Sequence, residues 1–152
     1  MLMLKLKKNR IKMNLKISWS NHLISLAVSL IFIPLALLGQ IGGNVIGNLL
    51  VWFNDYIAWW NFPNFIKIIT SSFISGFVAG YFSAFIILKI YKKVIVNTAT
   101  ILPAALIIFA VLGDLSFVVI NGFDLDTLGH FIRNGLTIYI YYSTLKGLKD
   151  IL

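Results

Sequence analysis

Three ionisable side chains, Asp114, His130 and Arg133, lie inside long apolar stretches of this sequence. A charge is costly in an apolar environment, so such residues are usually paired with one another or reached by water. An Asp114–Arg133 ion pair that holds two helices together is the simplest expectation. The alternative is a proton or ion relay through Asp114 and His130, because histidine ordinarily titrates near neutral pH and can exchange a proton with a carboxylate.

The positions of these residues in the sequence support their proximity. Asp114 precedes the end of one apolar stretch at residue 120, and Arg133 follows the start of the next at residue 128. Each should therefore lie about 8 to 9 Å below the same membrane surface, at about 1.5 Å per helical residue. If the two helices are adjacent and antiparallel, Asp114 and Arg133 lie level, with His130 one turn nearer the surface.

Other kinds of chemistry have little support in the sequence. It has no phosphate-binding loop, no HExxH and no GxSxG motif, and the closely spaced Asp124 and Asp126 fit a helix cap better than a metal site. Without cysteine, and with two histidines far apart, neither a disulfide nor a structural metal site is expected. We predict no catalytic residues, no metal and no cofactor, and therefore a protein that is not an enzyme.

The composition indicates what surrounds these residues. Hydrophobic residues make up 59% of the 152 residues, charged residues make up 12%, and the mean hydropathy is +0.91. A typical soluble domain has about twice this share of charge. Lipid must therefore solvate most of the surface, and we predict an all-α integral membrane protein built as a four-helix bundle.

The apolar stretches define the expected spans, since a helix needs about 20 residues to cross the hydrocarbon core. A basic tail over residues 1–21 precedes a transmembrane domain over 22–152. The four spans are predicted at about residues 23–41, 68–88, 94–120 and 128–145. Residues 42–65 combine glycine, asparagine and six Trp or Phe side chains. This mixture of residue types favours an interfacial or re-entrant segment. An extension of the first helix and a flexible glycine-rich loop are the alternatives.

The distribution of basic residues predicts the orientation. Six in the tail, three over residues 89–93 and two near the C-terminus make eleven of the 13, and all lie on one side if both termini do. Because basic residues favour the cytoplasmic side, we predict a multi-pass protein of the cell membrane with both termini in the cytoplasm. Its tail should contact anionic lipid headgroups. The tail residues concerned are Lys5, Lys7, Lys8, Arg10, Lys12 and Lys16. Short basic clusters beside apolar stretches leave no surface suited to nucleic acid.

Rows of small and amide side chains predict how the helices pack. Small residues spaced four apart let two helix backbones approach closely in a membrane. One such row consists of Ser72, Gly76, Gly80 and Ala84, and a second of Gly39, Gly43 and Gly47. An amide row runs beside the second, at Gln40, Asn44 and Asn48. These amides could bond to another helix or line a wet path.

Two functions remain open from the sequence. The first is a non-enzymatic membrane subunit, acting as an anchor, scaffold or regulator in an assembly with its own copies or with another membrane protein. Short loops leave little room for a cavity within one chain, which favours this hypothesis. The second is a small oligomeric ion or proton channel or transporter, whose polar path includes Asn44, Asn48, Asp114 and His130.

Overall fold

The computed structural model describes residues 19–57, 63–149 and 151, and within these ranges the only regular secondary structure is helical. A helical segment over residues 19–29 precedes four longer helices. These are α2 (Phe32–Ile57), α3 (Asn64–Ile90), α4 (Val96–Asn121) and α5 (Leu125–Leu148). The predicted all-α fold is confirmed. The six basic tail residues expected to contact lipid all lie outside the described residues.

The first helix bends at residues 30–31 and then continues much further than predicted. Pro34 causes the bend, because its ring clashes with the carbonyl four residues earlier and it has no amide hydrogen to donate. The amides of Leu30 and Ile31 donate instead to carbonyls three residues back, at 3.2 and 3.1 Å. Beyond the bend, α2 runs unbroken to Ile57. Residues 42–57 thus extend the first helix, and they form neither a re-entrant turn nor a glycine-rich loop.

Within the described ranges, three helical stretches are long and apolar enough to cross a membrane. They are Trp19–Tyr56, Asn64–Ile90 and Val96–Asn121. The fourth predicted span corresponds to α5, which has 24 residues but a more polar sequence. Its polarity comes from Asp126, His130, Arg133 and Lys146. Hydropathy alone therefore identifies three candidate spans, which support the membrane character of the chain.

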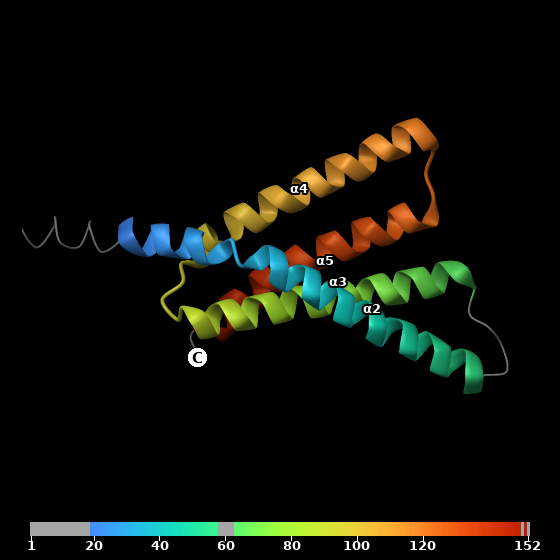
Figure 1. The fold of residues 1–152 in the computed structure, drawn as a ribbon, viewed down its shortest axis with the longest axis horizontal. Coiled ribbons are helices and arrows are strands. Elements are labelled where there is room, and N and C mark those ends of the chain that lie inside the picture. Colours follow the sequence, from blue (N-terminus) through green and yellow to red (C-terminus); the bar gives the residue numbers. More distant parts are fainter. Residues whose placement is uncertain (1–18, 58–62, 150, 152) are drawn as a thin grey trace, which may run out of the picture.

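The arrangement is centred on α3, which packs extensively against both α2 and α5, whereas α4 makes a smaller contact with α5 (Figure 1). The end of α2, the start of α3 and the α4–α5 turn lie at one end of the molecule (Figure 1). The start of the segment 19–29, the α3–α4 turn and the end of α5 lie at the other end. We call it the basic end because it carries Lys89, Lys92, Lys93, Lys146 and Lys149. In this view α2 and α4 diverge away from the basic end (Figure 1).

Glycine allows the close packing of α2 on α3. A Cβ atom added to Gly39 would lie 2.6 Å from the Ala79 Cα, and one added to Gly43 would lie 2.5 Å from the Ser75 Cα. At Gly47 the nearest atom would be the Ser71 Cα, at 2.9 Å. Real Cβ atoms do not approach backbone this closely. The glycine row of α2 therefore lies directly against α3, and this packing compensates for the poor helix propensity of glycine.

The small-residue row of α3 lies against α5. A Cβ added to Gly76 would come within 2.6 Å of the Arg133 carbonyl oxygen, and one added to Gly80 within 2.5 Å of the Thr137 carbonyl oxygen. Ser72 continues this contact, because its Oγ would lie 2.7 Å from a Cβ added to Gly129. Ala84 is fully buried in the apolar core. Both small-residue rows thus serve contacts within one chain.

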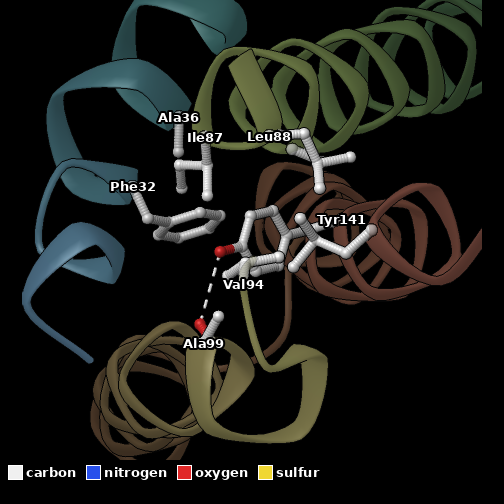
Figure 2. Packing of buried hydrophobic residues seen from close by; sticks show 9 residues of the cluster. Phe32, Ala36, Ile87, Leu88, Val94, Ala99 and Tyr141 are labelled. Carbon is white, nitrogen blue, oxygen red and sulfur yellow. Dashed lines mark hydrogen bonds between the residues drawn. The ribbon is translucent and has the colours of Figure 1, made fainter. Parts of the chain in front are cut away.

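An apolar core fills the basic end around Tyr141, which is fully buried (Figure 2). The ring of Phe32 meets that of Tyr141 edge-on, with 4.8 Å between centroids. The Tyr141 hydroxyl donates to the Ala99 carbonyl at 3.3 Å, as the dashed line in Figure 2 shows. Ile87, Leu88, Val94 and Leu145 complete the packing. Side chains from several helices thereby close the bundle at this end.

Polar contacts fix the segment 19–29 to the α3–α4 turn. The Tyr91 hydroxyl donates to Asn21 Oδ1 at 2.9 Å, and the Ile95 amide donates to Ser25 Oγ at 2.9 Å. His22 Nδ1 lies 2.6 Å from Thr98 Oγ1. These bonds satisfy backbone and side-chain groups near the start of α4, and they hold the segment at the basic end.

Asp124 caps α5 and gives a pH-dependent prediction. Its carboxylate accepts from the Thr127 amide at 2.7 Å, and hydrogen bonds from Thr127 hold the pKa of this exposed carboxyl below its ordinary value of 3.8. A lowered pKa means that the charged cap stabilises the fold above about pH 4 and that this contribution is lost as the pH falls further. In thermal unfolding at a series of pH values, Asp124→Asn should keep the cap and lose this acid-dependent part. An unchanged acid dependence in Asp124→Asn would contradict the prediction.

Candidate functional site

A polar cavity of about 940 Å³ lies between α2, α3, α4 and α5, in the half of the molecule away from the basic end. Residues of all four helices line it. Its polar lining consists of Asn44, Asn48, Asp55, Lys67, Ser71, Ser72, Asp114, Asp124, Asp126, Thr127, His130 and Arg133. A concave site with several convergent polar groups is the usual form of a binding site, and we treat this cavity as the candidate functional site.

The cavity brings together two groups that the sequence singled out separately. Asn44 and Asn48 line it from α2, while Asp114 lines it from α4 and His130 and Arg133 line it from α5. The third amide of the row, Gln40, is not part of the lining. The backbone carbonyl of Gln40 accepts a hydrogen bond from Ser75 Oγ at 3.1 Å. The amide row thus enters the cavity from Asn44 onward.

Asp114 pairs with a different residue from the one expected. His130 Nδ1 lies 3.3 Å from Asp114 Oδ1, and the Asp114–Arg133 ion pair is not formed. The reason is the direction of the side chains rather than their depth. The Arg133 backbone lies against Gly76 of α3, whereas the His130 side chain remains 47% exposed and reaches Asp114.

Two polar atoms in this part of the cavity have no hydrogen-bond partner. They are Asp114 Oδ2 and Arg133 Nε, both of which are buried. Buried polar atoms are nearly always hydrogen-bonded, so unpaired ones in a cavity point to a ligand or to solvent. An unpaired acceptor and an unpaired donor therefore lie at the inner part of the site.

The cavity is acidic although the chain is basic. The chain has five acidic residues and a formal charge of +8, and four of the five, Asp55, Asp114, Asp124 and Asp126, line the cavity. Lys67 and Arg133 are the basic residues of the lining, which leaves a formal charge of −2 with His130 neutral. The cavity should therefore attract cations, as a charged cleft with low-dielectric walls does.

Sequence reasoning missed the ion pair at the mouth of the cavity. Lys67 Nζ lies 2.5 Å from Asp55 Oδ2, and both side chains are less than a third exposed. The two residues are twelve positions apart, on either side of the α2–α3 connection. The available signal was a pair of opposite charges on either side of the connection between two helices. We did not use it, because we expected residues 42–65 to form an interfacial segment.

The cavity does not continue to the basic end. Below it, the close contacts of Gly39 with Ala79 and of Gly80 with Thr137 join α3 to its two neighbours. The apolar core around Tyr141 follows (Figure 2). The site is thus a pocket that is closed on the side of the basic residues.

The described residues contain no group of three or more side chains suited to hold a metal ion. A scan against protein-family models and searches of curated proteins and of solved structures found no match to this chain. The cavity, with its acidic lining and the Asp114–His130 contact, is therefore the feature from which a function can be inferred.

Proposed function

We propose that this chain is a small multi-pass membrane transport protein in which the cavity forms the outer half of a pathway for protons or other cations. The observation that carries this proposal is the acidic cavity itself, with Asp114 and His130 in contact at 3.3 Å in its inner part. Ionisable residues within membrane spans are costly, and they commonly mark the paths of ions and protons.

The proposed topology has four spans, with α5 as the fourth and both termini in the cytoplasm. A helix of 24 residues is about 36 Å long, enough to cross the hydrocarbon core. His130 and Arg133 of α5 line the cavity, so they need not face lipid. The gathering of lysines at the basic end favours a cytoplasmic position for that end (Figure 1). The cavity, which lies in the other half of the molecule, then faces outward.

The proposed chemistry needs few groups. The Asp114 carboxylate attracts a cation, and a proton can pass from His130 Nδ1 to Asp114 Oδ1, one N–H bond breaking as one O–H bond forms. Arg133 lies one turn further in, where its positive charge opposes direct passage of a cation. Transport therefore requires a conformational change, and α4 is the helix best suited to move. In the most apolar window of 18 residues of α4, 6% of the residues are buried. In the corresponding window of α3, 44% are buried.

Flux measurements test the proposal. Purified protein in liposomes should carry a proton or cation flux, and Asp114→Asn should reduce it at least tenfold. Ser116→Ala is the matched control, because this exposed hydroxyl on the same helix donates only to the Leu112 carbonyl. Absence of flux under every gradient tried, or full flux in Asp114→Asn, would refute transport.

The membrane-subunit hypothesis remains a second candidate, and the surface of α4 favours it. Large apolar side chains along this helix are exposed, including Phe109 at 73% and Val119 at 85%. Lipid or a protein partner could cover this surface. The mass of the particle in native lipid, together with any co-purified protein, distinguishes the two. A monomer without partners would remove this candidate.

A further inference from the structure

We infer that the cavity binds an organic cation that carries aromatic or other apolar groups, rather than an anion or a metal ion. The inference rests on the proposed function, because it assigns a class of ligand to the same cavity and to the same carboxylate, Asp114. Charge, size and the side chains of the wall each contribute to it.

The charge of the lining selects a cation. Lys67 is already paired with Asp55 at 2.5 Å. The remaining charges of the lining, with His130 neutral, are three negative ones on Asp114, Asp124 and Asp126 and one positive one on Arg133. The innermost of these carboxylates still has an unpaired oxygen, Asp114 Oδ2. A cationic group near Asp114 would stabilise the charge of a carboxylate that has few hydrogen bonds of its own.

The size of the cavity and its donor groups argue against a metal ion. Calcium takes six to eight oxygen ligands at about 2.3 to 2.6 Å, and magnesium needs a tighter octahedron. No such cluster of ligands occurs among the described residues. A volume of about 940 Å³ lies instead at the upper end of the range for pockets that hold drug-sized molecules.

The wall of the cavity supplies surfaces for the apolar part of the ligand. Trp52 and Val51 line it from α2, Ile68 from α3 and Phe117 from α4. Trp52 also stacks on Tyr56, with 5.7 Å between centroids and 18° between planes, which supports its ring. Aromatic faces attract organic cations, and apolar side chains gain from burying hydrocarbon. An acidic group among aromatic and apolar walls suits an amphiphilic cation.

Arg133 sets the inner limit of this site. It lies one turn beyond His130 on α5, and its backbone is fixed against Gly76. A cation that entered more deeply would meet the guanidinium charge. The cationic centre should therefore stay at the level of Asp114, with its apolar groups toward Trp52 and Phe117.

Equilibrium dialysis of the full chain in detergent tests the inference with two probes of the same shape and opposite charge, tetraphenylphosphonium and tetraphenylborate. We expect saturable binding of tetraphenylphosphonium and none of tetraphenylborate. Asp114→Asn should weaken binding at least tenfold, whereas Asp114→Glu should restore most of it and so exclude misfolding as the cause. Trp52→Leu should weaken binding about threefold to thirtyfold. Trp19→Leu, at an exposed tryptophan outside the cavity, should have no effect.

Several results would overturn the inference: no saturable binding of tetraphenylphosphonium, equal binding of tetraphenylborate, or displacement of the cation by micromolar Mg²⁺. Binding is measured without a gradient, so it is independent of flux. Binding that Asp114→Asn weakens, in a protein that carries no flux in liposomes, supports the cation site and refutes transport. Flux that depends on Asp114, without binding of the probe, supports transport and refutes the organic cation.

Discussion

Replacing Gly43 with alanine is expected to destabilise the fold by about 1 to 3 kcal/mol, the usual cost of forcing extra volume into a packed contact. The added Cβ would lie 2.5 Å from the Ser75 Cα and 3.2 Å from the Ile74 carbonyl oxygen. Both neighbours belong to the backbone of α3, so no side chain can turn away to make room. The two helices would have to separate, and the neighbouring contact at Gly47 would be strained as well.

Gly42 provides the matched control for Gly43→Ala. It is the preceding residue in α2, and a Cβ added there would meet nothing within 4 Å. Gly42→Ala should be neutral or stabilising by up to about 1 kcal/mol, because alanine favours helix over glycine. Thermal unfolding of both variants in one detergent measures the difference. Equal midpoints would mean that α2 does not pack on α3 through its glycine row.

A cysteine at position 48 is expected to react with a membrane-impermeant maleimide at least ten times faster than cysteines at positions 46 and 50. The chain has no cysteine of its own, so each variant carries a single thiol. Asn48 lines the cavity, whereas Ile46 and Leu50 are exposed and point about 200° away around the helix. Thiols react as thiolates, which form readily only where water reaches them.

Ile46→Cys and Leu50→Cys bracket Asn48→Cys in depth, so a difference in rate reports direction rather than position along the helix. Adding the reagent to only one side of sealed vesicles also tests the orientation, since the cavity should be reached from the side opposite the basic end. If all three thiols reacted equally slowly, water would not reach the cavity in the membrane. The transport and ligand proposals would then lose their common basis.

The sequence was informative about the helices because their apolar stretches are long, and length is what a membrane span requires. It failed at residues 42–57, where glycine and asparagine argue against helix in water. In the folded chain, Gly43 and Gly47 of this stretch pack against the surface of α3 at Ser75 and Ser71, which favours the helix. That surface is supplied by another part of the chain, and no local pattern around residue 43 reveals it.

The candidate site was predictable in depth but not in direction. Counting residues placed Asp114 near both His130 and Arg133, and all three do line one cavity. It could not decide which of them Asp114 contacts, since the rotation of α5 about its axis is fixed by the packing of Arg133 on Gly76. Nor could it find the cavity, whose wall consists of residues from four helices that only the folded chain brings together.

The central position of α3 also bears on how the protein is made. On the proposed topology α5 crosses the membrane, although it is too polar to qualify as a span by hydropathy. During synthesis α3 emerges before α5, and N-terminal parts of a chain generally fold first. The surface formed by Ser72, Gly76 and Gly80 would then already lie in the bilayer when α5 leaves the ribosome. Membrane insertion of the last helix would thus depend on an earlier one. A bulky residue at Gly80 would block the packing of α5 on α3, and α5 would then fail to insert into the bilayer.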